Sequence, residues 1–259
     1  MQNSNLPKVD RYVFMAEPFH CDFQKRLFMG HLGNHMLNAA DFHANARGFG
    51  MDYLNSIRRT WVLSRLAIEM QQMPRAYTRF YVQTWVEKAM RFFTHRNFKV
   101  YDADNGTVYG YGRSVWAMID TDTRQPADLL SVNDGALVSY VETDEPCPID
   151  SHSRVKMGDG AELMATRRAM YNDIDVNGHV NSVKYIEHVL DLFPLEWYAK
   201  HPLRRLEIAY VAEGHPDDLL CYYREQTSHT EYMVRITGKK EPDGDEQELC
   251  RCRVCFNEH

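Results

Sequence analysis

The sequence predicts an α+β protein in which one structural unit occurs twice. Three observations agree on this. The order strand, helix and then four strands is found in both halves, offset by roughly 145 residues. Each predicted helix carries apolar residues at helical spacing, and each group of strands is separated by turn residues. A long helix followed by antiparallel strands favours a sheet wrapped around that helix, so we expect two helix-wrapped antiparallel sheets in one chain.

The first half supplies the first predicted unit. A strand at residues 11–19 precedes a helix at 32–47, where Leu32, Met36 and Ala40 recur on one side and Gly48 is placed to end the helix. Asn105-Gly106 is a strong hairpin signal between two of the strands that follow. Those strands are predicted at residues 60–69, 80–87, 92–101 and 108–119.

The second half repeats this order with little residue identity. A strand at 163–169 precedes a helix at 180–193, which Pro194 ends, and a short helix follows at 195–200. Four strands are predicted at residues 203–212, 219–225, 232–238 and 249–256. Residues 120–160 have little periodic pattern and many turn residues. We therefore expect domains at 1–125 and 161–259, joined by a connector at 126–160.

The bulk composition is that of a globular protein outside the membrane. Hydrophobic residues make up 44% and charged residues 25% of the 259 residues. The N-terminus has no apolar signal region and no run could span a bilayer, so we expect a cytoplasmic location and no membrane span. Cys252 and Cys255 have C-x-x-C spacing, but no second pair completes a zinc site. We expect a strand there and no metal.

Charge is distributed unevenly along the chain. The formal net charge of −6 argues against nucleic-acid binding. Residues 58–99 nevertheless hold nine Lys or Arg against two acids, and residues 213–248 hold ten acids against four bases. The basic stretch suggests one acidic partner, although unrelated outward-facing strand charges would give the same count.

A dense polar run at residues 172–181 is the strongest functional signal. It places Asp175, Asn177 and His179 on alternate positions around Gly178, directly before the second helix. Free backbone N–H groups and the positive end of a helix dipole collect at such a junction, which suits a developing oxyanion. The backbone N–H groups of residues 178–180 are the expected donors. A capped polar loop without chemistry is the alternative for each residue taken alone.

The residues from Tyr171 to Ile186, Tyr-Asn-Asp-Ile-Asp-Val-Asn-Gly-His-Val-Asn-Ser-Val-Lys-Tyr-Ile, resemble the signature of the acyl-ACP thioesterases, the enzymes that release fatty acids from acyl carrier protein (ACP). Blocks in the first half, such as Trp61-Val-Leu-Ser-Arg65 and Ser114-Val-Trp-Ala-Met118, are similar to that family as well. The resemblance implies a tandem (double) hotdog fold and hydrolysis of the acyl thioester.

The resemblance also implies site residues. Asp175, Asn177 and His179 correspond to the family's catalytic loop, and Glu213 to its catalytic glutamate. A cysteine has been proposed as a nucleophile one place after that glutamate, but this chain has Gly214 there. We therefore expect activated water or a carboxylate as the nucleophile, and leave open whether Asp175 attacks directly or acts through water.

The expected reaction releases free fatty acid and holo-ACP, as in fatty acid biosynthesis, with no cofactor and no metal. The partner would be an acyl carrier protein bearing an acyl-phosphopantetheine, docked on some of the Arg and Lys residues of 58–99, and a homodimer is possible. The acyl chain needs an apolar slot, which we expect in the first half. The alternatives are an acyl-CoA thioesterase of the same fold and a non-catalytic hotdog module that senses acyl thioesters.

Overall fold

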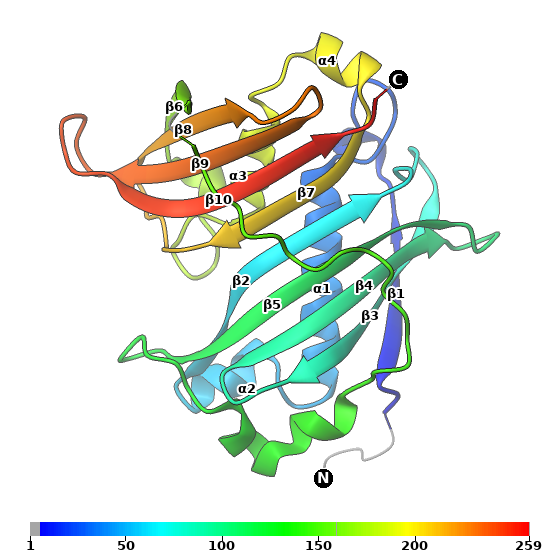
Figure 1. Cartoon of the computed structure of the whole chain (residues 1–259). Helices are drawn as coiled ribbons and strands as arrows, with labels where there is room; N and C mark the ends of the chain where they lie inside the picture. The colour runs from blue at the N-terminus through cyan, green and yellow to red at the C-terminus, as the bar shows by residue number, and fades with distance from the viewer. Residues whose placement is uncertain (1–5, 159, 259) are drawn as a thin grey trace. The chain divides into compact units, whose positions relative to one another are not determined.

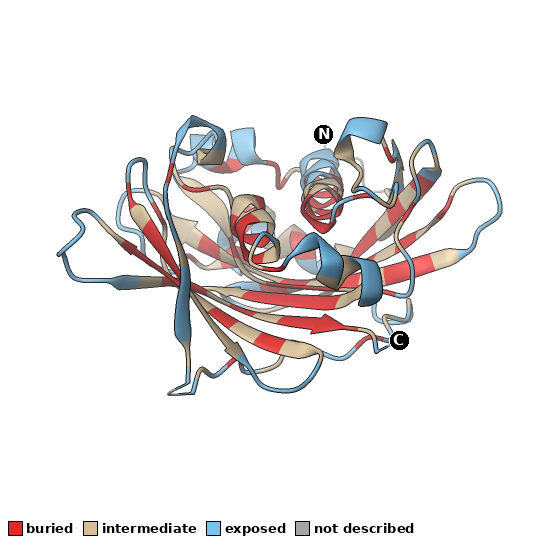
Figure 2. Cartoon of the chain, turned by 90° about the horizontal axis from the view of Figure 1, so that it is seen from above, coloured by how far each residue is buried: buried red, intermediate tan, exposed pale blue. Residues whose placement is uncertain are grey.

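The computed structural model describes residues 6–158 and 160–258, and the chain forms two compact units. Unit 1 comprises residues 1–151 and unit 2 residues 152–259. Each unit contains one antiparallel sheet and one long helix that lies against it (Figure 1). In both, buried residues concentrate in the strands and in the long helices, and exposed residues in the loops (Figure 2).

Unit 1 is a five-stranded antiparallel sheet in the order β1-β3-β4-β5-β2. The long helix α1 (Met29–Ala46) runs behind this sheet in Figure 1. The short helices are η1 (Pro18–His20), α2 (Met51–Ser56) and η2 (Leu129–Tyr140). The strands are β1 (Val9–Met15), β2 (Arg59–Met70), β3 (Arg79–Ala89), β4 (Phe93–Asp102) and β5 (Val108–Asp120).

The packing of α1 explains two glycines. A Cβ on Gly112 of β5 would lie 3.1 Å from the sulfur of Met36, so Gly112 lets the helix approach the sheet closely. Gly48 has φ of 81° just after the helix end, the left-handed conformation that commonly terminates helices. The predicted end of the helix is confirmed.

Residues of η2 belong to the core of unit 1. Leu129, Val132 and Leu137 are buried in a cluster that also contains Phe49 and Met118. The segment that we expected to be a connector therefore carries apolar side chains that pack inside unit 1. Its weak periodicity follows from its conformation, since residues 132–135 interrupt the helix with non-helical backbone angles.

Two buried arginines, Arg47 and Arg96, lie next to His43, the histidine in the last turn of α1. Arg96 donates from Nη1 to Thr84 Oγ1 at 3.1 Å, and its Nη2 lies 3.4 Å from His43 Nδ1. Arg47 donates to the His43 carbonyl at 2.9 Å. Burial, with Arg96 and Arg47 adding to it, lowers the pKa of His43 to about 2, so this histidine is neutral.

Unit 2 is a second five-stranded antiparallel sheet, in the order β7-β10-β9-β8-β6. The helix α3 (Ser182–Leu190) packs on it, with Tyr210 of β7 donating to the Ser182 carbonyl at 2.9 Å. The other helices are η3 (Tyr171–Asp173) and α4 (Leu195–Lys200). The strands are β6 (Glu162–Arg168), β7 (Leu203–Tyr210), β8 (Leu219–Gln226), β9 (Glu231–Lys239) and β10 (Gln247–Phe256).

Every strand and long helix predicted from the sequence is present, with ends displaced by a few residues. The Asn105-Gly106 turn joins β4 to β5, and Cys252 and Cys255 lie in β10, as expected. The short helices α2, η1, η2 and η3 were not predicted. Across the described residues, no helix combines the length and the apolar character that crossing a membrane requires.

Candidate active site

The polar run forms a closed loop at the base of α3. An isolated antiparallel bridge between Ile174 and Val180 closes the loop, and α3 begins two residues later. Asn181 caps the helix, since its side chain accepts from the Val183 N–H at 2.9 Å. Asn181 is therefore the capping residue of α3.

The carboxylate of Asp175 organises this loop from within. Its Oδ1 accepts from the backbone N–H of Asn177 at 2.8 Å and of His179 at 3.3 Å. Gly178 has φ of 79°, a conformation that suits glycine and lets the chain reverse at this point. One oxygen of Asp175 is thus committed to the loop, and the side chain of Asn177 is exposed.

The backbone N–H groups expected to bind an oxyanion already have partners. Gly178 donates to the Asp175 carbonyl at 3.0 Å, and Val180 donates to the Gly214 carbonyl at 2.8 Å. The His179 N–H points to the Asp175 carboxylate. These bonds hold the loop, so the oxyanion donors predicted at residues 178–180 are not available in this conformation, and that expectation was wrong.

The loop and the segment after β7 bring three titratable side chains together. His179 Nε2 lies 3.5 Å from Glu213 Oε2, with side chains 28% and 36% exposed. The ring of His215 stands at 87° to that of His179, with centroids 5.4 Å apart. The fold thus places Glu213 at the loop, which is the condition that its predicted role required.

His215 is close to an acid, Asp218, that lies in the same turn of the chain. Asp218 Oδ2 accepts from the His215 N–H at 2.8 Å and lies 3.7 Å from the His215 ring Nδ1. Lys240 Nζ lies 2.5 Å from the other oxygen of Asp218. His215 was not predicted as a site residue. Its position two residues after Glu213 was the only sequence signal for it.

A buried hydrogen-bond network supports the loop from beneath. His188 of α3 has its Nε2 3.2 Å from Asp173 Oδ1 and its Nδ1 2.7 Å from the Tyr222 hydroxyl. Asp173 Oδ2 accepts from the Met170 N–H at 2.8 Å, and the Asp173 carbonyl accepts from the Asn181 N–H at 2.8 Å. Asp173 therefore joins both ends of the loop to the helix and, through His188, to β8.

The network fixes the protonation of His188. Burial lowers its pKa, and the neighbouring Asp173 carboxylate opposes that shift without reversing it. A neutral ring that donates from Nε2 to the carboxylate must accept at Nδ1, so the Tyr222 hydroxyl donates there. Neither His188 nor Asp173 was predicted as a site residue.

Position 214 has no room for a side chain. A Cβ there would lie 2.4 Å from the hydroxyl oxygen of Tyr185 and 3.1 Å from Val180. Tyr185 is 2% exposed, so its phenol cannot move out of the way into solvent. A cysteine nucleophile at this position is therefore excluded by packing as well as by the sequence.

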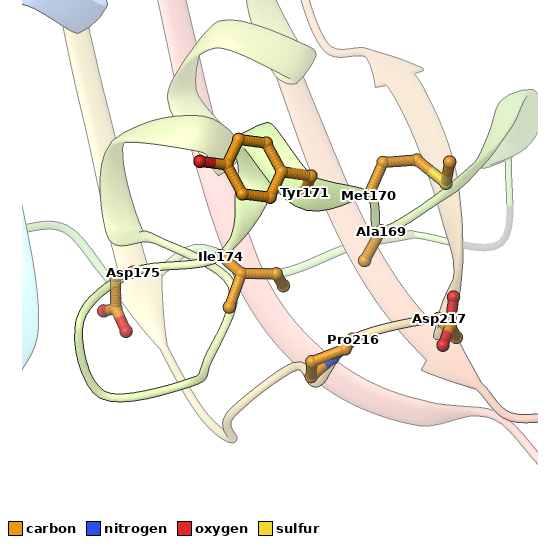
Figure 3. Close-up of a pocket in the computed structure, with 7 residues that line it drawn as sticks. All are labelled: Ala169, Met170, Tyr171, Ile174, Asp175, Pro216 and Asp217. Carbon is orange, nitrogen blue, oxygen red and sulfur yellow. The ribbon is translucent and has the colours of Figure 1, made fainter.

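A cavity of about 420 Å³ opens beside the loop (Figure 3). Its lining comes from the end of β6, the loop and the turn after β7, and most of it is apolar. Asp175 contributes a carboxylate to one wall. The lining residues are Ala169, Met170, Tyr171, Ile174, Asp175, Pro216 and Asp217. Within residues 6–158 and 160–258, no group of three or more His, Cys, Asp or Glu side chains is arranged to hold a metal ion.

Unit 1 contains a second copy of the loop backbone. Asp22 Oδ1 accepts from the N–H groups of Gln24 and Arg26 at 2.8 and 2.9 Å, as Asp175 does in unit 2. A bridge between Cys21 and Leu27 closes this loop, and α1 likewise begins two residues later.

The bonds of the two copies to their surroundings also correspond. Leu27 donates to the Pro74 carbonyl at 2.9 Å, as Val180 does to Gly214. Tyr77 donates to the Ala16 carbonyl at 2.8 Å, as Asp217 does to Ala169 at 3.1 Å. By this pattern the unit 1 counterparts of Gly178, His179, Glu213, His215 and Asp217 are Lys25, Arg26, Met73, Arg75 and Tyr77.

Comparison with known proteins decides the family. The acyl-ACP thioesterase N-terminal domain matches residues 11–133, and the C-terminal domain of the same family matches residues 159–258. A solved acyl-ACP thioesterase from Bacteroides thetaiotaomicron is 51% identical, with a TM-score of 0.88 over 96% of this chain and 98% of that one. The chain belongs to the acyl-ACP thioesterase family.

Other members of the family are more distant. An oleoyl-acyl carrier protein thioesterase of Arabidopsis thaliana chloroplasts is 26% identical in an alignment of 244 positions that covers 87% of this chain and 65% of the relative. The chain thus spans slightly less than two thirds of that relative's length. The 12:0-ACP thioesterase from Umbellularia californica shares the fold, with a TM-score of 0.82 at 20% identity over 98% of both chains. The expected double hotdog fold is confirmed.

Proposed function

We propose that this chain hydrolyses the thioester of fatty acyl-ACP and releases a fatty acid and holo-ACP. The observation that carries the proposal is the pair formed by His179 and Glu213 at 3.5 Å, on a loop that Asp175 organises. Family membership gives the reaction class, and the pair supplies the acid-base groups that thioester hydrolysis needs.

In the proposed mechanism, water attacks the thioester carbonyl. The His179–Glu213 pair takes the proton from the water as its oxygen bonds to the carbonyl carbon. The same pair then gives that proton to the sulfur as the C–S bond breaks, so the products are a carboxylic acid and a thiol. No covalent enzyme intermediate is required, which agrees with the absence of space for a side chain at Gly214.

Asp175 and Asn177 complete the proposed site. Because Asp175 Oδ1 already holds the loop, direct attack would fall to its other oxygen, and we favour a positioning and electrostatic role for this residue. The backbone N–H groups of the loop are engaged, so we assign the oxyanion contact to the side-chain amide of Asn177, an exposed donor at the tip of the loop.

We assign the cavity beside Asp175 to the thioester end of the substrate arm, because its apolar walls meet the catalytic loop there. The acyl slot remains assigned to the first half, within residues 1–125, and the catalytic residues to 161–259, with 126–160 between them. A cytoplasmic location and a homodimer stay predictions.

The test is thiol release from purified protein with acyl-ACP and acyl-CoA of matched chain length. We expect a higher kcat/KM on acyl-ACP. Glu213→Gln and His179→Ala should each lower kcat by at least about 100-fold with an unchanged melting temperature, while Glu196→Gln, an exposed acid on α4, should behave as wild type.

Each of the other outcomes identifies another function. A preference for acyl-CoA would make the chain an acyl-CoA thioesterase. Tight binding of acyl thioesters without turnover would make it a sensor.

A further inference from the structure

The corresponding loop of unit 1 is part of an exposed lobe whose side chains differ from those of the loop in unit 2. We call residues 15–28 and 74–79 the docking lobe. Its two segments are joined by backbone hydrogen bonds, from Leu27 to the Pro74 carbonyl and from Ala76 to the Lys25 carbonyl, both at 2.9 Å. A bridge between Arg26 and Arg75 adds to them. The two segments are therefore held together as one surface and are not independent loops.

The lobe exposes large apolar side chains. Phe19 is 97% exposed and Tyr77 is 73% exposed. Single exposed apolar residues are ordinary, but a group of them on one element of a soluble protein marks an interaction site. Aromatic residues, Met and Arg are the types enriched at protein interfaces. The exposed apolar members are Met15, Phe19, Phe23, Phe28 and Tyr77.

The lobe also carries cations without acidic partners. Lys25, Arg75 and Arg79 are exposed, and none forms an ion pair within the part of the chain that the structure describes. The lobe has two acids of its own: Asp22 is paired with Arg26 at 2.8 Å, and Glu17 lies 3.2 Å from the ring nitrogen of His20. The cationic and aromatic groups thus form one surface with a positive excess.

Most other basic residues of 58–99 are paired with carboxylates or buried. Arg58, Arg59 and Arg91 pair with the carboxylates of Asp122, Asp120 and Asp128. Arg96 is buried. The sequence predicted that some of seven residues form a carrier-protein dock: Arg58, Arg59, Arg75, Arg79, Lys88, Arg91 and Arg96. Of these, only Arg75, Arg79 and Lys88 are exposed without an ion pair in the described chain. Two of these three lie in the lobe.

The correspondence with the loop of unit 2 shows which side chains differ between the two loops. Lys25 takes the place of Gly178 and keeps its left-handed backbone, with φ of 61°. Arg75 takes the place of His215, and Tyr77 that of Asp217, again with positive φ at both positions, 70° and 65°. The backbone is retained in conformations that are unfavourable for lysine and tyrosine, while the two histidines are replaced by arginines, Glu213 by a methionine and Asp217 by an aromatic ring.

We propose that the docking lobe binds the acidic carrier protein that delivers the acyl thioester, an inference that rests on the proposed function. Carrier proteins of this type are small and strongly acidic, so the cations are complementary to them and raise the association rate, while the aromatic residues add contact area.

Two other occupants fit the lobe less well. Two copies of the chain meeting lobe to lobe would bring the same three cations together. Three cations give only a marginal attraction to an anionic membrane.

The experiment compares two substrates with the same acyl group, one on ACP and one on a short pantetheine analogue. Arg75→Glu/Arg79→Glu should lower kcat/KM for acyl-ACP by at least roughly tenfold at low salt, mainly through KM, and leave the short thioester unaffected. Phe19→Ser should give a smaller loss of the same kind. Raising the salt should reduce the wild-type advantage on acyl-ACP, since screening is nearly complete beyond about 8 Å at 0.15 M.

Lys88→Glu is the matched control. Lys88 is an exposed, unpaired cation on the same strand as Arg79, nine residues away and so roughly 30 Å distant. It should behave as wild type. Equal rates of wild type and the double variant on acyl-ACP, or an equal loss on both substrates, would overturn the proposal.

Direct binding of holo-ACP to immobilised protein separates this inference from the proposed function. If wild type hydrolyses neither substrate, the proposed function fails, and loss of holo-ACP binding in the double variant alone would still support the lobe. Binding of phosphatidylglycerol vesicles that disappears in the double variant, with holo-ACP binding unchanged, would assign the lobe to a membrane and overturn the proposal.

Discussion

The loops before the two long helices have the same backbone and different side chains. Both are closed by a bridge, both have an aspartate that accepts from two loop N–H groups, and both turn through a residue with positive φ. Asp22 makes these bonds in a loop where Arg26 and Met73 stand in the places of His179 and Glu213. The hydrogen bonds of Asp175 are therefore a property of the fold, and what distinguishes unit 2 is the group of titratable side chains beside that carboxylate, His179, Glu213 and His215.

The last turns of the two helices differ in the same way. His43 of α1 is packed among two arginines, whereas His188 of α3 is packed against the carboxylate of Asp173. Unit 1 uses buried cations at this place and unit 2 a buried acid that also anchors the catalytic loop. The two histidines are not equivalent positions of the repeat, since the correspondence of the loops matches His188 to His35 of α1, and only the buried acid beside His188 is linked to the candidate site.

The largest effect should separate the two aspartates. Asp175→Asn keeps an oxygen that can accept the loop hydrogen bonds but removes the charge, and we expect kcat on a short acyl thioester to fall at least about 100-fold. Asp22→Asn should leave that rate unchanged, because its loop has no chemical role. Both variants should melt within a few degrees of wild type. Loss of activity in both, or in neither, would break the comparison.

A smaller effect should appear in the pH dependence of stability. The pKa of His43 is about 2 when folded and near 6.5 when unfolded, so between these values only the unfolded state binds the proton. Stability is therefore lost as the pH falls below about 6.5, at up to about 1.4 kcal/mol per pH unit. His43→Gln should flatten this slope between pH 6.5 and 5, as measured by urea denaturation.

His188 provides the comparison for that measurement. Its pKa is lowered in the same direction, but Asp173 opposes the shift, so His188→Gln should flatten the slope less than His43→Gln does. It should also reduce activity, because the loop loses its anchor, whereas His43→Gln should not. If His188→Gln flattened the slope more than His43→Gln does, the charged neighbours would not control the pKa values of these histidines.

The smallest effect concerns the residues with positive φ. Lys25→Gly should raise the free energy of unfolding by about 1 kcal/mol, since glycine adopts φ of 61° without the cost that lysine bears. Gly178→Ala should lower it by a similar amount at φ of 79°. Thermal denaturation measures both. Equal melting temperatures would mean that the two loops relax freely at this position.

The sequence predicted most of the fold because its periodic patterns were strong. The helix stripe of Val183, Ile186 and Val189 and the turn at Asn105-Gly106 are local signals, and both were interpreted correctly. Helix α2 was missed because its six residues are too few to show a period and no proline marks its start, as Pro194 does for the equally short α4. The expected connector was featureless because η2 contains non-helical backbone.

The candidate site was predictable only where its residues lie close together in sequence. Asp175, Asn177 and His179 form a motif, and Glu213 followed from the resemblance. Asp173 lies before α3 and His188 in its last turn, so their positions in the sequence do not indicate that the two side chains are in contact. The sequence shows that the counterpart run of the first half, Asp22 to His31, lacks Asp-x-Asn-x-His, so one active site per chain was expected. It does not show that the backbone is shared, because Asp22 is the one site-motif residue retained and Lys25 conceals a turn that glycine would have signalled.

The close contact between Gly214 and Tyr185 restricts how this chain can evolve. Any side chain gained at position 214 collides with the phenol, and a change at Tyr185 alone leaves a buried hole beside Glu213. Each single step is therefore unfavourable, while the two together are compatible. The two positions are expected to change in concert, so a lineage that reaches a cysteine at 214 must pass first through a smaller residue at 185.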